Sequence, residues 1–194
     1  INPAPSARAI TLLLVFLSPS AFAKWQLQGN ESSVNFVSVK SSQTAEVHHF
    51  KKLTGAISDT GAVELNIDLT SAETNIGIRN DRVKAMLFET STFSKAKVSG
   101  AIDIEKVAHL NVGDSYIETV KLDLDLHGAS QEVSNEVQVV KLNDGKLLVS
   151  SIRPVVINAS SFGLEKGIEQ LREVAKLPSI STAVPVTFNL IFVQ

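Results

Sequence analysis

The side chains that could carry out chemistry in this sequence are few, and their spacing supports little of it. His48 and His49 are adjacent, but neighbours in a β-strand point to opposite faces, so the pair cannot grip one metal ion. His109 and His127 are far away in the sequence, and the chain has no cysteine. We therefore interpret the histidines as structural or solvent-facing residues and expect no metal site.

Sequence motifs of nucleophilic and cofactor-dependent catalysis do not support an enzyme either. The chain has no G-x-S-x-G nucleophile elbow, no glycine-rich phosphate loop and no dinucleotide-binding fingerprint. Serines are numerous, but a serine becomes a nucleophile only when a neighbouring base activates it in the folded protein. We therefore expect a protein without catalytic residues and without a cofactor.

The most distinctive polar residues form a run of charges, Arg79–Arg82, that leads a short helical pattern. Ile78, Val83 and Leu87 fall roughly on one stripe of that helix. The charges have two interpretations. They either contact a ligand, or they only cap and solvate the helix, as exposed charges usually do.

The elements that must position these side chains are mainly β-strands. Val63, Leu65 and Ile67 alternate with polar residues, which predicts a strand with one buried and one solvated face. The same period-two pattern recurs at residues 120–126 and 184–192. We expect the apolar sides of these three strands to face a common interior.

About eight such strands follow one another, mostly joined by tight turns such as Asn143-Asp-Gly145. Two short helices interrupt them, one near residues 78–87 and one near residues 164–175. Sequential antiparallel strands can close into a barrel or stack as a sandwich. We predict a mainly β fold, an eight-stranded antiparallel barrel with two short helices, whose interior holds packed side chains or one small ligand.

The first residues predict export from the cytoplasm. Arg8 precedes a short apolar run at residues 10–17, and Ala21-Phe-Ala23 follows as a cleavage signal. The run is shorter than the ~20 apolar residues that span a bilayer. We interpret residues 1–23 as a signal peptide and residues 24–194 as the mature barrel domain. The periplasm is the expected compartment, with secretion as the alternative, and the absence of cysteine excludes a lipoprotein anchor.

The overall charge and the aromatic content limit the possible partners. The formal net charge is −2, with Lys and Arg scattered along the chain, so we expect no nucleic-acid ligand. An outer-membrane barrel also has alternating strands, but it carries aromatic girdles, whereas this chain has one Trp and one Tyr. We favour a barrel with water outside and an apolar interior, which is either filled by its own side chains or occupied by a hydrophobic molecule.

Several segments, spread over nearly all of residues 25–194, resemble the YceI-like family. The resemblance begins at Trp25 and Ser33-Val-Asn-Phe36 and is most specific in the segment Ser71-Ala-Glu-Thr-Asn-Ile-Gly-Ile-Arg-Asn-Asp-Arg-Val-Lys-Ala-Met-Leu-Phe88. It recurs at Leu126-His-Gly-Ala-Ser130 and at Ile157-Asn-Ala-Ser-Ser-Phe-Gly163. The resemblance implies a periplasmic protein that binds polyisoprenoid lipids in a lipocalin-like barrel.

Three positions depart from the pattern of that family. Asn80 stands where the family often has Asp, and His127 and Ala159 stand where it often has Arg. With two positive charges missing, a neutral head group such as a quinone or a fatty amide is as consistent with the sequence as a pyrophosphate. The lipid and its head group therefore stay open at this point.

The function expected from the sequence is that of a periplasmic binding or carrier protein for an isoprenoid or other long-chain lipid, such as a polyprenyl phosphate or an isoprenoid quinone. The alternatives are a lipid-modifying enzyme that uses the same cavity and a structural or stress protein with a filled core. A transient membrane contact and a homodimer are left open. The candidate ligand-binding residues are Phe36, Phe50, Leu65, Ile67, Arg79, Asn80, Leu87, Phe88, Leu122, Leu124, Phe162 and Phe188.

Overall fold

Strand β8 (Ser115–Leu126) has the alternation of faces that its sequence predicts. In the computed structural model of the chain, which describes residues 23–194, Val120 and Leu124 are buried, whereas Lys121 and Asp123 are exposed. Because strand side chains alternate between the two faces of a sheet, one face of β8 packs inward and the other meets solvent. The other long strands follow the same rule.

The described part of the chain is built from twelve strand segments, three α-helices and four short helical turns. The strands other than β8 are β1 (Ala23–Leu27), β2 (Ser33–Lys40), β3 (Thr44–Phe50), β4 (Leu53–Ser58), β5 (Ala62–Asp68), β6 (Ala72–Glu73), β7 (Lys95–Ala101), β9 (Ala129–Lys141), β10 (Lys146–Ser151), β11 (Val155–Asn158) and β12 (Ala183–Val193). The helical segments are η1 (Gly29–Glu31), η2 (Leu69–Ser71), α1 (Gly77–Arg82), the π-helical turn η3 (Val83–Leu87), α2 (Ile104–His109), η4 (Ala159–Phe162) and α3 (Glu165–Val174).

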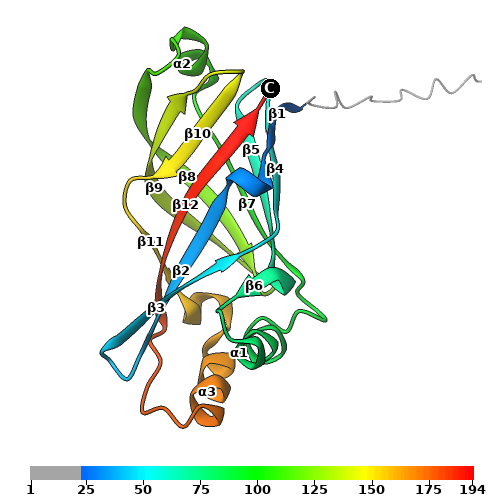
Figure 1. Ribbon diagram of the computed structural model, residues 1–194, viewed down its shortest axis with the longest axis vertical. Coiled ribbons are helices and arrows are strands. Elements are labelled where there is room, and N and C mark those ends of the chain that lie inside the picture. The colour runs from blue at the N-terminus through cyan, green and yellow to red at the C-terminus, as the bar shows by residue number, and fades with distance from the viewer. Residues whose placement is uncertain (1–22) are drawn as a thin grey trace, which may run out of the picture.

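Eight antiparallel strands close into a barrel, which confirms the fold expected from the sequence. The order around the ring is β1, β4, β5, β7, β8, β9, β10 and β12, and β12 pairs with β1 to complete it. The long strand β12 pairs with β10 and then β11 along one edge, and with β1 and then β2 along the other. Strands β2, β3 and β6 thereby extend the wall beyond the closed ring (Figure 1).

The turn between β9 and β10 shows how the local sequence sets the connection. Asp144 and Gly145 both have positive φ, at 57° and 69°. Paired positive φ values are typical of the two-residue hairpin turns for which Asn-Gly and Asp-Gly sequences are preferred. The hairpin predicted at this position is therefore present, and it keeps β9 and β10 in register from Val137 to Lys141.

Helical segments lie at both ends of the barrel. Helix α2 lies at one end, near the C-terminus of β12, and α1 and α3 lie at the other end (Figure 1). Helices α1 and α3 are the two insertions that the sequence predicts. Helix α2 is an addition to the prediction, and Asp103 caps it by accepting hydrogen bonds from the backbone N–H groups of Glu105 and Lys106.

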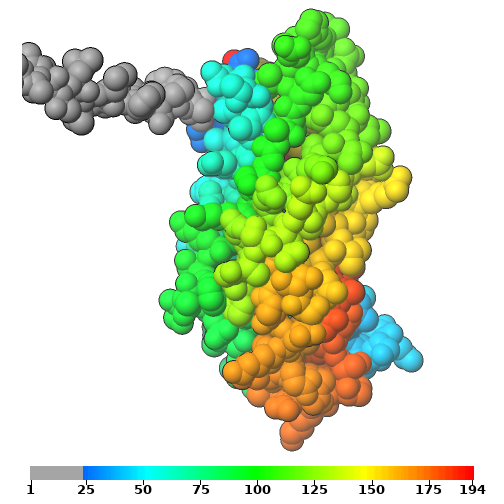
Figure 2. Space-filling model, turned by 180° about the vertical axis from the view of Figure 1, so that it is seen from behind, coloured from blue at the N-terminus to red at the C-terminus, as the bar shows by residue number. Residues whose placement is uncertain are grey.

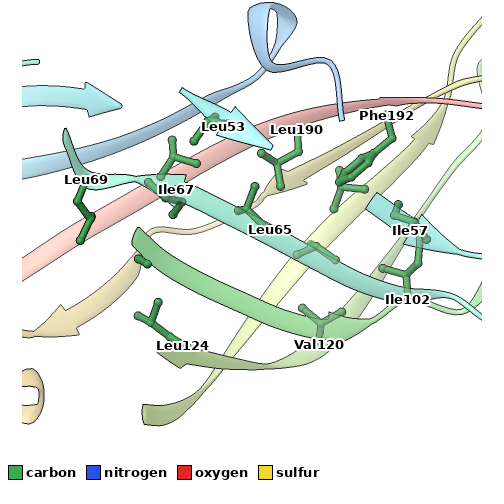
Figure 3. Close-up of a cluster of buried hydrophobic side chains, with 14 of the residues drawn as sticks. Leu53, Ile57, Leu65, Ile67, Leu69, Ile102, Val120, Leu124, Leu190 and Phe192 are labelled. Atoms are coloured by element: carbon green, nitrogen blue, oxygen red, sulfur yellow. The ribbon is translucent and has the colours of Figure 1, made fainter. Parts of the chain in front are cut away.

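The end of the barrel near α2 is filled by its own side chains. Phe192 and Ile57 are completely buried there, close to each other in the interior (Figure 3). Trp25, Val139 and Leu147 belong to the same core and are also buried. From the outside, the wall formed by β8 and β9 runs down to α3 at the opposite end (Figure 2).

Two sequence expectations concern the N-terminal segment and the membrane. The signal peptide predicted for residues 1–23 lies, apart from Ala23, outside the residues that the structure describes. Within residues 23–194, none of the helices has both the length and the apolar character needed to cross a bilayer.

Candidate functional site

A cavity of about 540 Å³ runs through the barrel interior. It extends from the level of Ile102 and Val149 to the helices α1 and α3. Its wall is formed mainly by the inward-facing apolar side chains of β2, β5, β7, β8 and β12. Leu65 and Ile67 on β5 and Val120 and Leu124 on β8 point into this space (Figure 3). A volume of this size lies within the range of small-molecule binding pockets.

Ten of the twelve candidate residues line the cavity. They come from strands, from the helical segment α1–η3 and from the residue that follows it. These ten residues are Phe36, Phe50, Leu65, Ile67, Arg79, Leu87, Phe88, Leu122, Leu124 and Phe188. Their position in the cavity wall is established, and their contact with a ligand stays a prediction.

The other two candidates, Asn80 and Phe162, do not belong to the lining. The Oδ1 of Asn80 accepts hydrogen bonds from the backbone N–H of Thr74 at 2.8 Å and from its hydroxyl at 2.6 Å, and its Nδ2 donates to Glu73 at 2.7 Å. Asn80 therefore fastens the loop between β6 and α1. Phe162 is buried in the hydrophobic core at η4, and its carbonyl oxygen accepts a hydrogen bond from Nδ1 of His127 at 3.2 Å.

Helix packing explains how α1 and η3 reach the cavity. The backbone N–H of Phe88 donates to the carbonyl of Val83, five residues earlier, which widens the last turn into a π-helix. Val83 and Leu87 of this turn, together with Phe88 directly after it, line the cavity. Gly167 of α3 lies against η3 so closely that a Cβ there would come within 2.5 Å of the carbonyl oxygen of Met86.

A cluster of charged side chains lies where the cavity approaches α1. The carboxylate of Glu46 accepts a hydrogen bond from Nη1 of Arg79 at 2.8 Å and faces Nζ of Lys40 at 2.7 Å. The hydrogen bond from Lys40 holds the pKa of Glu46 below its ordinary value, and Arg79 adds to this effect. Arg79 also donates from Nη2 to the carbonyl oxygen of Thr74 at 2.5 Å.

The same region contains a buried histidine with one free ring nitrogen. His48 is 4% exposed and lines the cavity, and its Nε2 lies 2.8 Å from the hydroxyl of Ser38. Burial lowers the pKa of His48, and the positive charge of Arg79 lowers it further. Among the described residues, Nδ1 of His48 and Nε of Arg79 are two of three buried side-chain atoms without a hydrogen-bond partner, and the third is Nδ2 of Asn135.

Aromatic rings continue the wall from His48 into the barrel. The ring centroids of Phe36 and His48 are 5.1 Å apart, those of Phe36 and Phe50 are also 5.1 Å apart, and those of Phe50 and Phe88 are 6.0 Å apart. Tilted rings at these separations are typical of favourable aromatic pairs. The rings form one continuous patch, so a ligand chain that passes His48 next meets aromatic carbon.

Sequence reasoning missed most of the polar side chains that face the cavity. The sequence predicts a structural or solvent-facing role for His48, and its patterns do not single out Ser38, Lys40 or Glu46. The signal that could have found them is the alternation of β2 and β3. Phe36, Ser38 and Lys40 are spaced two apart, as are Glu46, His48 and Phe50, and each set shares the inward face of its strand.

The two adjacent histidines of β3 lie on opposite faces of the sheet in the folded chain. His48 faces the cavity, and His49, the next residue in β3, faces the other side of the sheet. Within the described residues, no three His, Asp or Glu side chains gather in an arrangement that could hold a metal ion.

Comparison with known proteins gives concordant results. A YceI-like domain is matched over residues 25–192. A solved polyisoprenoid binding domain from Saccharophagus degradans, implicated in plant cell wall breakdown, has 39% sequence identity and a TM-score of 0.87, with 89% of this chain and 99% of that chain covered. BcnA from Burkholderia cenocepacia has 20% identity and a TM-score of 0.66, with coverages of 85% and 98%, which shows a shared fold. No curated protein matches significantly. The chain belongs to the YceI-like family.

Proposed function

We propose that this protein binds an isoprenoid or another long-chain lipid in the barrel cavity and carries or sequesters it in the periplasm without changing it chemically. The observation that carries the proposal is the cavity of about 540 Å³ with its nearly continuous apolar lining. The solved structure at 39% identity is described as a polyisoprenoid binding domain, which supports the same ligand class. The alternative of a structural protein with a filled core does not agree with the open space inside the barrel.

The free energy available from apolar burial suffices for a carrier. If a lipid chain buries ~400 Å² of apolar surface in the cavity, the gain is about 10 kcal/mol before the ordering costs of binding. The lining supplies aliphatic and aromatic carbon for such a chain, from Val120 and Leu124 on one wall to Phe36 and Phe50 on another.

The polar cluster suggests how the ligand is oriented. Ser38, Lys40, Glu46, His48 and Arg79 face the cavity near α1, whereas the opposite end is closed by the buried Phe192 and Ile57. A buried polar atom without a partner costs about 1–3 kcal/mol, so a ligand oxygen at Nδ1 of His48 or Nε of Arg79 would relieve that cost. We infer that the polar end of the lipid lies at this cluster and that its chain extends toward Phe192.

The direct test is native mass spectrometry of the protein purified from the periplasm of its own host. We expect a lipid with a prenyl chain at close to one molecule per protein chain. An empty barrel that also fails to bind added isoprenoid quinones and polyprenyl phosphates would contradict the proposal. Cell fractionation during the same purification tests the periplasmic location, and the mass of the intact protein tests cleavage after Ala23.

Turnover distinguishes a carrier from a lipid-modifying enzyme. We expect a radiolabelled polyprenyl phosphate to be recovered unchanged after incubation with the protein. Conversion that is lost in a His48→Gln variant would instead indicate a reaction in the cavity. Light scattering of the purified protein tests whether it forms a homodimer, which the sequence leaves open.

A further inference from the structure

The rim of the cavity near α1 and α3 exposes apolar side chains to solvent. Ile76 and Ile78 at the start of α1 are 47% and 60% exposed, and Val174 at the end of α3 is 42% exposed. All three also line the cavity. Five other large apolar side chains in the described residues are comparably exposed, and none of those five lines the cavity.

These three side chains lie where the cavity meets the outer surface of the protein. The same residues face both water and the cavity, so the apolar lining continues out through the opening between α1 and α3. Both helices lie at this end of the barrel (Figure 1). Apolar patches exposed in this way commonly mark interaction sites with proteins or membranes.

The charged side chains at the opening carry a net positive charge. The charged residues that line the cavity are Lys40, Arg79 and Arg82 against the single acid Glu46, a net charge of +2. Within residues 23–194, Arg82 has no ion pair, whereas Glu46 is shared by Lys40 and Arg79. Lys176, two residues after Val174, is exposed and likewise has no ion pair in that part of the chain.

The acids of the two helical segments at the rim do not reverse this balance. Residues 77–87 carry three basic residues and one acid, and residues 165–176 carry three of each. Asp81 lies 3.4 Å from Lys84, whereas Glu169 and Glu173 share Arg172, which is hydrogen-bonded to Glu169 and lies 4.0 Å from Glu173. Glu73 accepts from the backbone N–H of Asn75 and pairs with Lys51. Arg82 and Lys176 are two cations near the opening that form no ion pair within residues 23–194.

We propose that this rim, formed by Ile76, Ile78, Val174, Arg82 and Lys176, docks on an anionic lipid bilayer. The apolar side chains enter the boundary between head groups and acyl chains, and the two basic side chains contact anionic head groups. The cavity then opens directly into the bilayer, so a lipid moves between membrane and barrel without exposing its chain to water. This inference rests on the proposed function as a lipid carrier.

Flotation with vesicles tests the docking. We expect the wild-type protein to float with phosphatidylglycerol-containing vesicles and to bind pure phosphatidylcholine vesicles about tenfold or more weakly, because each basic residue near an anionic surface contributes about a fivefold increase. Added salt should weaken the binding, since the head-group contacts are screened. Equal binding to both vesicle types, or no binding to either, would overturn the proposal.

A triple variant and its matched control locate the docking surface. Ile76→Ser, Ile78→Ser and Val174→Ser together should lower vesicle binding about tenfold or more, because the apolar contact is lost. The control combines Val47→Ser, Ile117→Ser and Val156→Ser, at residues that are 63%, 59% and 63% exposed and lie outside the cavity lining. The control should float like the wild type. Equal loss in the two variants would contradict the assigned surface.

A cavity probe separates this inference from the proposed function. Parinaric acid, a fluorescent long-chain fatty acid, reports on the cavity in the absence of vesicles. If the wild type binds parinaric acid but does not float with anionic vesicles, the docking proposal is wrong and the carrier function stands. If neither parinaric acid nor a polyprenyl phosphate binds, the carrier function itself fails.

Discussion

The guanidinium of Arg79 donates from Nη1 to Oε2 of Glu46 at 2.8 Å, which ties the first charge of the α1 run to the middle of β3. The sequence left two interpretations of this charge, a ligand contact or helix solvation. In the folded chain Arg79 lines the cavity and pairs with a residue 33 positions away, and its Nε has no hydrogen-bond partner within residues 23–194. Its role is therefore set by tertiary contacts at the polar cluster.

Replacing Arg79 should affect both stability and the choice of head group. Arg79→Gln removes hydrogen bonds to Glu46 and to the carbonyl of Thr74, so we expect a loss of about 1–3 kcal/mol in the free energy of unfolding. Because the cavity-lining charges sum to +2, we expect the wild type to bind a polyprenyl phosphate more tightly than the corresponding alcohol. In the variant, the ratio of these two affinities should be about tenfold smaller. Urea unfolding and competition with parinaric acid measure the two effects.

The control for this variant is Lys84→Gln, in the same helical segment but outside the cavity lining. Within residues 23–194, the one ion pair of Lys84 is with Asp81, at 3.4 Å, so little change is expected in either measurement. An unchanged phosphate preference in Arg79→Gln would show that Arg79 does not contact the head group.

Filling the cavity should abolish lipid binding while the barrel stays folded. Val98 on β7 lines the cavity and is only partly buried, so Val98→Trp places a large ring in the open space. We expect binding of parinaric acid to weaken about tenfold or more, because the ligand chain loses the apolar wall that it would contact. Fluorescence titration measures the affinity, and circular dichroism checks the fold.

Lys97→Trp provides the matched control for the filled cavity. Lys97 is the preceding residue of β7 and is exposed on the outer face of the sheet, outside the lining. The Lys97→Trp variant should bind parinaric acid as tightly as the wild type does. If both tryptophan variants bind equally well, the ligand does not occupy the barrel interior.

The contact between α3 and η3 should be sensitive to a single methyl group. Gly167→Ala would place a Cβ 2.5 Å from the carbonyl oxygen of Met86 and 2.8 Å from Cα of Leu87, so the helices must move apart. We expect a loss of about 1–3 kcal/mol in the free energy of unfolding, measured by urea denaturation. Gly77→Ala in α1 is the control, because within residues 23–194 no atom beyond its own helix backbone and chain neighbours lies within 4 Å of a Cβ placed there, and alanine favours the helix. It should leave stability unchanged or raise it by up to about 1 kcal/mol.

Acid should destabilise the fold through His48. Burial keeps the pKa of His48 in the folded chain below the ordinary value of 6.5, whereas the unfolded chain takes up a proton near that value. The neutral His48 ring therefore makes its full contribution to the free energy of unfolding above about pH 6.5. This contribution is lost as the pH falls toward the lower pKa of the folded state. We expect the wild type to lose more stability than His48→Gln between about pH 7.5 and pH 5.5.

The exposed His109 gives the comparison for this pH effect. Its Nδ1 lies 2.7 Å from the carbonyl oxygen of Glu105 on the surface of α2, far from the cavity lining. His109→Gln should keep the pH dependence of the wild type in thermal unfolding measured across that range. If the thermal stability of His48→Gln falls with pH as steeply as that of the wild type, another group causes the acid sensitivity.

Several features of the fold could be predicted because they depend on local patterns. The alternation of β5 and β8 identifies Leu65, Ile67, Val120 and Leu124 as inward-facing whatever their partners are, since strand geometry alone sets the face. The turn at Asn143-Asp-Gly145 follows from backbone preferences of the same short segment. Helix α2 was missed because its six residues give too short a periodic pattern, and its cap at Asp103 is the only strong local signal.

The candidate site depended more on distant contacts. The charged run predicts a ligand contact for Asn80, but Thr74 and Glu73 take its hydrogen bonds in the loop before α1. Phe162 lies in a segment that resembles the family and is a predicted ligand contact, but η4 directs it into the hydrophobic core. The sequence argues against a metal site at His48, and only the pairing of β3 with β2 shows that this side chain faces Ser38 inside the barrel.

The sequence by itself determined the mainly β class, the inward faces of the strands and the positions of the two helical insertions, because these follow from residue spacing along a short stretch of chain. Only the tertiary structure decided that apolar side chains fill the end at Phe192 but leave a cavity of about 540 Å³ toward α1. It also decided that Arg79 faces Glu46. The physical reason is that a void and an ion pair depend on the distances between segments far apart in the chain, which strand closure and helix packing set together.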